Sequence, residues 1–404
     1  MPPQSYKNDR PAQNCAGRSS TGIYAQGGHG GEILAAAARA GLNPASILDF
    51  SSNTNIFALE LTKNLFQQIF TPDYPFTRYP DASCAELSAA IAGLEALEPS
   101  NVLCGNGAAD LIWLCLRALA PASVLFLGPV FSEYIRACEA LKIKYEIIAT
   151  RPEDEFACTA EAMSRLWESG ESSAELTVLC SPNNPGGIAY HNLQNMVAAV
   201  RSPRLLVDLS YREFLFSTPD YSRHTWRELS RHCQPGCELL GLHSFTKFFC
   251  CPGLRLGYLT GESKSIARLK KEAPAWSVWQ AAQDIGCAFI ENIEAYRNTL
   301  ADLAAARQEF GFNLRRFPLF DPDLVLEGPN FYCCGLAGND LPGGRKRKLD
   351  AEAGKLQNFL LGRGLLIRDC DNIPGMPPGF VRIQVRGSKD NERLLDALQR
   401  FLLP

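Results

Sequence analysis

Short, largely apolar runs alternate with longer helical patterns along most of this chain. Between residues 101 and 242 these runs are well separated, at 101–104, 123–127, 145–148, 176–180, 205–207 and 238–242. Strands that are buried on both faces have this pattern, and the helical stretches between them suit the crossover connections of a parallel sheet. The pattern therefore predicts an α/β fold in which helices cover a mostly parallel sheet.

The rest of the chain predicts a second, smaller unit. An Ala-rich helical stretch at about 274–313 suits a connector, and the short strands and helices after it indicate a C-terminal α+β domain. A chain of 404 residues also exceeds the usual size of one core. We expect a flexible N-terminal arm over 1–28, a segment at 29–75 that joins the small domain, a large domain at 76–285 and the small domain at 286–404.

Composition and charge narrow the classes of partner. The chain is 46% hydrophobic and 21% charged, with a net charge of −3, so bulk electrostatic attraction to nucleic acid or to a membrane surface is not expected. It has no run of 18 apolar residues, and its polar N-terminus has no apolar signal core. We therefore expect a cytoplasmic protein with no nucleic-acid or membrane partner.

The 15 cysteines are scattered, and many lie inside apolar runs. An odd count argues against a disulfide framework, so buried reduced thiols are expected. His232, Cys233 and Cys237 have the only metal-like spacing. Because no second pair of ligands accompanies them, we predict no metal site.

The segment 243–258 carries the strongest chemical signal, since Ser244, Lys247 and Arg255 can serve one ligand together. A lysine forms a Schiff base with an aldehyde, while a hydroxyl and a guanidinium hold a phosphate nearby. Pyridoxal phosphate carries both groups on one ring. Phenylalanines at 245, 248 and 249 disfavour the charged form of the lysine, which helps an amine act as a nucleophile. Taken alone, the motif also fits a surface lysine near a buried arginine.

Polar residues follow the predicted strands, at the edge where such sheets collect ligands. Asp208 could keep a pyridine nitrogen protonated, a side-chain amide in the turn 181–187 could hydrogen-bond a phenolate oxygen, and Tyr211 could donate to the ring oxygen. The backbone N–H groups of the helix predicted from Ala108 would suit a phosphate, and Phe131 could stack on a ring. Each feature is common by itself, but their order around one lysine favours a pyridoxal phosphate site.

These motifs together resemble those of a known family. In chain order they are Gly105-Asn-Gly-Ala108, Pro129-x-Phe131, Pro182-Asn-Asn-Pro185, Asp208-x-x-Tyr211, Ser244-x-x-Lys247 and Gly253-x-Arg255-x-Gly257. This order is similar to that of fold-type I pyridoxal-phosphate enzymes, close to the histidinol-phosphate aminotransferases. The segments 29–55 and 367–386 most resemble the L-threonine-O-3-phosphate decarboxylases of cobalamin biosynthesis. The resemblance covers roughly residues 29–404.

The resemblance implies a role for each matching residue. Lys247 would be the catalytic Schiff-base lysine. Tyr79 would reach the cofactor phosphate from the partner subunit of a homodimer. The other implied cofactor contacts are Ala108, Ala109, Phe131, Asn184, Asp208, Tyr211, Ser244 and Arg255. The implied contacts to a small phosphorylated amino-acid substrate are His29, Gly30, Asn53, Asn184, Arg368 and Arg382.

Without the resemblance, the residues indicate an anionic substrate but do not identify it. Arg368 and Arg382 flank one loop and could hold two anions, because arginine makes bidentate contacts to carboxylate and phosphate; either could instead form an ordinary salt bridge. His29 alone, in a Gly-rich segment, could be a simple loop residue. The chain also departs from the family at Ile56, where proline is usual, and at Gly186.

The resemblance implies decarboxylation of L-threonine O-3-phosphate to (R)-1-aminopropan-2-yl phosphate, with L-serine O-phosphate as a second substrate. A histidinol-phosphate-type aminotransferase is the alternative, since it would share every cofactor residue. A non-catalytic regulator with the same fold is a further alternative, which the intact Lys247 disfavours.

Overall fold

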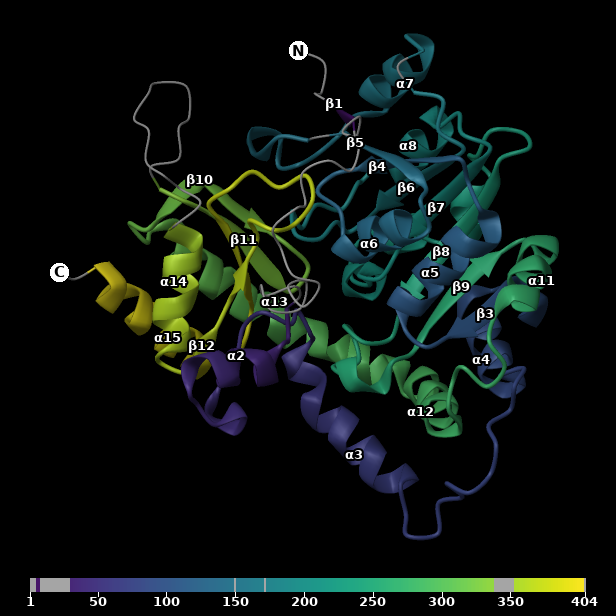
Figure 1. Ribbon diagram of the computed structural model, residues 1–404. Coiled ribbons are helices and arrows are strands. Elements are labelled where there is room, and N and C mark those ends of the chain that lie inside the picture. Colours follow the sequence, from purple (N-terminus) through teal and green to yellow (C-terminus); the bar gives the residue numbers. More distant parts are fainter. Residues whose placement is uncertain (1–4, 8–29, 149, 171, 338–351, 403–404) are drawn as a thin grey trace.

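The computed structural model describes residues 5–7, 30–148, 150–170, 172–337 and 352–402. Figure 1 shows two sheets, a large one that carries β3 to β9 and a smaller one that carries β10 and β11, with helix α13 (Ile293–Arg315) running between them.

The large sheet has the strand order β1-β5-β4-β6-β7-β8-β9-β3. Neighbouring strands from β5 to β8 are parallel, whereas β9 is antiparallel to both of its neighbours and β1 is antiparallel to β5. Its strands are β1 (Ser5–Lys7), β3 (Val102–Gly105), β4 (Ser123–Leu127), β5 (Lys144–Ile148), β6 (Leu176–Cys180), β7 (Arg204–Asp208), β8 (Glu238–Ser244) and β9 (Gly257–Gly261).

Apolar side chains alternate between two helical layers along the central strands. In β4, Val124 and Phe126 pack with the helices on one face, while Leu125 and Leu127 pack with those on the other. Because both faces are covered, these strands are apolar throughout. One layer holds α5 (Ala108–Leu119), α6 (Ser132–Ala140) and α11 (Ser263–Glu272), and the other holds α7 (Ala160–Glu168), α8 (Leu193–Ala199) and α10 (Trp226–Ser230).

The smaller sheet is antiparallel, in the order β10-β11-β14-β13. Its strands are β10 (Phe320–Glu327), β11 (Phe331–Leu336), β13 (Arg368–Asp369) and β14 (Phe380–Gln384), and α14 (Glu352–Leu361) and α15 (Ser388–Leu402) lie beside it. Two segments far apart in sequence meet here, because β2 (Leu48–Asp49) pairs in parallel with β12 (Leu365–Leu366). This pairing brings residues 48–53 to the edge of the small unit.

The remaining elements are short or connecting. The α-helices are α2 (Ile33–Ala40), α3 (Leu59–Ile69), α4 (Ala85–Glu95), α9 (Asp220–Arg223) and α12 (Gln280–Glu291). The 3₁₀ turns are η1 (Pro44–Ser46), η2 (Ile56–Ala58), η3 (Pro99–Asn101), η4 (Pro152–Asp154), η5 (Arg212–Leu215) and η6 (Pro252–Leu254).

The predicted fold class is confirmed, with two differences in detail. Strand β9 was absent from the predicted strands, because Gly257 and Gly261 at its ends weaken the apolar signal. The expected flexible arm falls mostly outside the described residues, but Ser5–Lys7 within it form the edge strand β1.

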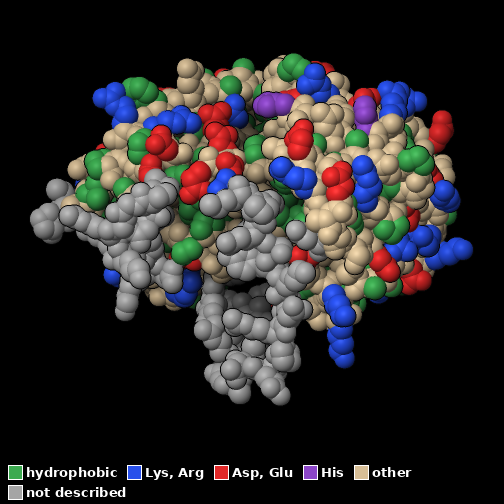
Figure 2. Space-filling model, turned by 90° about the horizontal axis from the view of Figure 1, so that it is seen from above, with side chains coloured by type: hydrophobic (Ala, Val, Ile, Leu, Met, Phe, Trp, Pro, Cys, Tyr) green, Lys and Arg blue, Asp and Glu red, His purple; other side chains and the backbone are tan. Residues whose placement is uncertain are grey.

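The surface charges, helix lengths and metal-binding side chains of the described residues also bear on the predictions. Basic and acidic side chains are interspersed over the face seen in Figure 2. In the part of the chain that the structure describes, no helix is long and apolar enough to cross a membrane. Within the same residues, no three His, Cys, Asp or Glu side chains are grouped to hold a metal ion, and the cysteines are free.

One helix glycine marks where α13 meets the small sheet. A Cβ on Gly311 would lie 2.0 Å from the hydroxyl of Tyr332 on β11, whereas a Cβ on the exposed Gly93 of α4 would meet nothing within 4 Å. We expect Gly311→Ala to lower the free energy of unfolding by about 1–3 kcal/mol through overpacking. Gly93→Ala should raise it by up to about 1 kcal/mol, since alanine favours a helix. Chemical denaturation of both variants checks this, and a neutral Gly311→Ala would contradict the close packing.

Candidate active site

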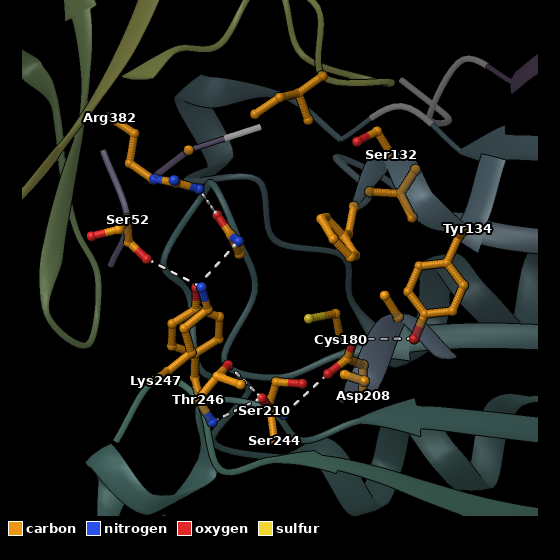
Figure 3. Close-up of a pocket in the computed structure, with 18 of the residues that line it drawn as sticks. Ser52, Ser132, Tyr134, Cys180, Asp208, Ser210, Ser244, Thr246, Lys247 and Arg382 are labelled. Carbon is orange, nitrogen blue, oxygen red and sulfur yellow. Dashed lines mark hydrogen bonds between the residues drawn. The ribbon is translucent and has the colours of Figure 1, made fainter. Parts of the chain in front are cut away.

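A cavity of about 1190 Å³, part of it open to solvent, lies where the parallel strands end. Leu127, Cys180, Asp208 and Ser244, which close β4, β6, β7 and β8, all line it. The small sheet contributes Arg368 and Arg382 from the opposite side. The cavity therefore lies between the two sheets, at the edge where α/β folds bind ligands (Figure 3).

The structure brings most of the predicted site residues together. Those that line the cavity are Gly30, Ala108, Ala109, Phe131, Asn184, Asp208, Tyr211, Ser244, Lys247, Arg255, Arg368 and Arg382. Asn53 is fully buried beside them, with its Nδ2 3.4 Å from the Tyr211 hydroxyl. Tyr79 is 81% exposed and is not among the lining residues. His29 lies outside the described residues.

Lys247 is held in an apolar setting with its amine turned to the cavity. Its Nζ donates to the carbonyl of Ser52 at 3.1 Å. Its neighbours in the sequence, Phe245, Phe248 and Phe249, are buried. Burial, and then the positive charges of two neighbouring arginines, lower its pKa to about 8. A lysine with this pKa reaches its neutral, nucleophilic form much more readily than one in water.

A second corner of the cavity is formed by the start of α5. No side chain caps this helix, and its N-cap, Gly107, has a φ of +85°. A Cβ at that position would lie 2.6 Å from Nη2 of Arg255, so only glycine lets the guanidinium approach the helix start. Ser244 completes the corner and accepts the N–H of Thr246 at 3.2 Å. Free helix N–H groups, a guanidinium and a hydroxyl make a site for a phosphate.

Asp208 lies at a third position, with both carboxylate oxygens hydrogen-bonded. The Tyr134 hydroxyl donates to Oδ2 at 3.0 Å, and the Ser210 N–H donates to Oδ1 at 3.0 Å. Burial raises the pKa of Asp208, while the bonds from Ser210 and Tyr134 oppose that shift. Tyr134 was not predicted; the only signal for it is its place one helical turn after Phe131.

Two amides orient the Tyr211 hydroxyl. Nδ2 of Asn184 donates to it at 3.3 Å and Nδ2 of Asn53 donates at 3.4 Å, so the hydroxyl accepts twice and keeps its own proton to donate elsewhere. Asn53 adopts a left-handed φ of 54°. Arg382 fixes the amide of Asn184, because its Nη1 donates to Oδ1 of that side chain.

Arg368 and Arg382 form a buried pair of cations. They are directly opposite each other on β13 and β14 and are 5% and 6% exposed. Arg382 also donates to the carbonyl of Ser51 at 2.7 Å, and Arg368 donates to Oδ1 of Asn372 at 2.5 Å. Like charges opposite each other on a sheet are unfavourable, so the pair suits a ligand with negative charge.

The arrangement fits pyridoxal phosphate. The uncapped helix start with Gly107 suits the phosphate, Lys247 suits the aldehyde, and the buried Asp208 suits the ring nitrogen. Asn184 links these groups to the arginine pair, because it donates to Tyr211 and accepts from Arg382.

Comparisons with known proteins agree with this geometry. Residues 45–401 match the family described as aminotransferase class I and II. The chain is 29% identical over 383 residues to the threonine-phosphate decarboxylase of Salmonella typhimurium, which covers 93% of this chain and 96% of the relative. It is 26% identical over 356 residues to a histidinol-phosphate aminotransferase of Desulfitobacterium hafniense, covering 84% and 88% of the two chains.

Solved structures show the same fold. The crystal structure of histidinol-phosphate aminotransferase from Sinorhizobium meliloti, in complex with pyridoxal 5'-phosphate, matches with a TM-score of 0.71 and 16% identity. The match covers 91% of this chain and 95% of that one.

The lowered pKa of Lys247 predicts a pH-dependent stability of the cofactor-free protein. The Lys247 amine has a pKa of about 8 in the folded chain and 10.5 in the unfolded chain. Between these two pH values the unfolded chain therefore binds more protons than the folded chain. The cost of burying the charge is therefore fully present below pH 8 and disappears as the pH rises towards 10.5. Lys247→Met, which has no charge, should be more stable than the wild type at low pH.

We expect the stability difference between Lys247→Met and the wild type to shrink by about 2 kcal/mol from about pH 7 to about pH 9.5. Urea denaturation at both pH values measures it, with Lys264→Met on the exposed start of α11 as the matched control. A difference that is constant with pH would show that the Lys247 amine is not desolvated.

Proposed function

This chain belongs to the class I and II aminotransferase family, and on that premise we propose that it decarboxylates L-threonine O-3-phosphate with pyridoxal phosphate as cofactor. The product would be (R)-1-aminopropan-2-yl phosphate, for the nucleotide loop of cobalamin, and L-serine O-phosphate would give ethanolamine phosphate. The observation that carries the proposal is the pair of buried arginines, Arg368 and Arg382, which face the cavity from the small sheet. The similarity to the Salmonella decarboxylase supports it.

Asp208 and Lys247 would have different roles in this reaction. Bound pyridoxal phosphate supplies an electron sink for the substrate bond at Cα that stands perpendicular to its ring. Asp208, held by Tyr134 and Ser210, would keep a proton on the ring nitrogen. Lys247 would hold the cofactor at its aldehyde carbon, and its amine would also supply a proton to the substrate Cα. A pKa near 8 allows the amine to carry and give up that proton near neutral pH.

The two arginines would select the reaction. A phosphoamino acid carries a carboxylate and a phosphate, and each anion can bind one guanidinium. By holding the two anions, Arg368 and Arg382 would set the orientation of the substrate Cα, and that orientation would decide between decarboxylation and transamination. A histidinol-phosphate-type aminotransferase remains the second candidate, since the relative from Desulfitobacterium is nearly as similar.

The test is to identify products. The cofactor-loaded protein is given O-phosphothreonine, O-phosphoserine, or histidinol phosphate with 2-oxoglutarate. We expect CO2 and an amine phosphate from the phosphoamino acids, with little glutamate in the third reaction. Stoichiometric glutamate without release of CO2 would favour the aminotransferase.

Relative rates on three substrates test phosphate recognition. One methyl group separates phosphothreonine from phosphoserine and is worth about 1–3 kcal/mol in a pocket, so both should react, with phosphothreonine favoured. Free threonine should react far more slowly, because buried cations would lose their partner. Comparison of kcat/KM measures this. Equal turnover of threonine and its phosphate would remove the proposed phosphate contact while leaving the cofactor chemistry intact.

We also propose that the enzyme is a homodimer whose partner supplies Tyr79. This side chain is exposed and packs on Trp276 with ring centroids 5.0 Å apart. Phe76, Trp276 and Trp279 are exposed nearby, at 65%, 52% and 45%. Large aromatic side chains that gather on a surface mark an interface more often than a solvated face.

We also propose that the enzyme is cytoplasmic, where the free thiols of the described cysteines would stay reduced.

Mixed dimers test the shared site. Lys247→Ala and Tyr79→Phe should each have little activity, but each heterodimer would contain one site with both residues intact. At random assortment about a quarter of all sites would be complete, so mixing after mild dissociation should restore activity. Mixing two preparations of the same variant is the control. A monomer that is fully active at the assay concentration would rule out the proposal.

A further inference from the structure

Beneath the turn that carries Asn184 lies a buried serine–histidine hydrogen bond. Oγ of Ser181 is 2.8 Å from Nε2 of His224, and both residues are fully buried. Nδ1 of His224 is 2.7 Å from the backbone carbonyl of Asp220. Neither His224 nor Ser181 lines the cavity, and the reaction proposed above does not use them.

The partners of His224 fix its tautomer. A carbonyl oxygen only accepts hydrogen bonds, so Nδ1 carries the proton that is donated to Asp220. Burial lowers the pKa of His224 to about 4, and the ring is therefore neutral near pH 7. In a neutral ring Nε2 has no proton, so it must accept the hydroxyl proton of Ser181.

Ser181 in turn closes the loop that presents Asn184. Its N–H donates to the carbonyl of Asp208, and its Oγ accepts the N–H of Tyr190 at 3.0 Å. The donor bond to His224 fixes the direction of the hydroxyl, so a lone pair stays aimed at Tyr190. The loop 181–190 is thereby closed at Oγ of Ser181, three residues before Asn184.

We propose that His224 is a positioning residue that acts through Ser181 to hold Asn184 against the cofactor. The proposal rests on the proposed cofactor contact of Asn184. The path is continuous: His224 orients Ser181, Ser181 closes the loop, and Asn184 reaches the Tyr211 hydroxyl at 3.3 Å. The same loop leaves strand β6 beside Asp208, so it joins two of the predicted cofactor contacts.

Two substitutions separate this role from a purely structural one. In His224→Asn the side-chain amide can still donate to the Asp220 carbonyl but cannot reach Ser181. In His224→Gln the longer side chain can still accept from Ser181 but loses the contact to Asp220. Each variant removes one hydrogen bond of the same buried ring, so both should lower the unfolding midpoint by similar amounts.

Cofactor binding distinguishes them and is measured without substrate. We expect the affinity for pyridoxal phosphate, from absorbance titration, to fall about tenfold in His224→Asn and to change about twofold or less in His224→Gln. The visible absorption band of the bound cofactor should shift only in His224→Asn. Because no amino acid is present, the result does not depend on which substrate the enzyme uses.

A double-mutant cycle gives the decisive comparison. If His224 acts through Asn184, the effect of His224→Asn on cofactor affinity should vanish in an Asn184→Ala background. An equal effect in both backgrounds would overturn the proposal and leave His224 as a stabilising core residue. If His224→Asn does not fold, Ser181→Ala takes its place in the cycle, with the same two outcomes.

Discussion

The buried guanidinium of Arg382 is the contact on which the site depends. It extends from β14 of the small sheet, donates to the carbonyl of Ser51 in the N-terminal segment, and donates to Asn184 in the loop that follows β6 of the large sheet. One side chain thus ties together three segments that are far apart in the sequence. A buried cation is costly unless its donors find acceptors, so the bonds from Nη1 and Nη2 favour this arrangement of the three segments, while the buried Nε has no hydrogen-bond partner among the described residues.

The same demand gives the cavity its chemical character. Arg368 and Arg382 on one side and Arg255 with Lys247 on the other place positive charge around a space whose buried acid is Asp208. Burial, and then the like charges of Arg382 and Arg255, lower the pKa of Lys247. Gathering these positive charges therefore lowers the stability of the ligand-free fold, and the binding of an anionic ligand would offset that loss.

Much of this could be read from the sequence, because the informative residues lie in short motifs at strand ends. The strand at 176–180, the helix at 108–119 and the cluster around Lys247 are where the sequence places them. Strand β9 and Tyr134 were missed for different reasons. Glycines mask the strand, whereas Tyr134 acts through a tertiary contact with Asp208 that no local pattern encodes. The bond between Ser181 and His224, whose partners are 43 positions apart, was missed for the same reason as Tyr134.

Tertiary contacts also explain a departure from the family pattern. A Cβ on Gly186 would lie 3.1 Å from two carbons of Phe156 and 3.2 Å from Oδ1 of Asn183. Phe156 is 1% exposed and packs edge-on against Phe380 of the small sheet, with ring centroids 5.7 Å apart. The ring of Phe156 thus fills the space that a side chain at 186 would need, so the two positions constrain each other. The departure at Gly186 is therefore a matter of packing beside the loop, and it leaves the hydrogen bonds of Asn184 in place.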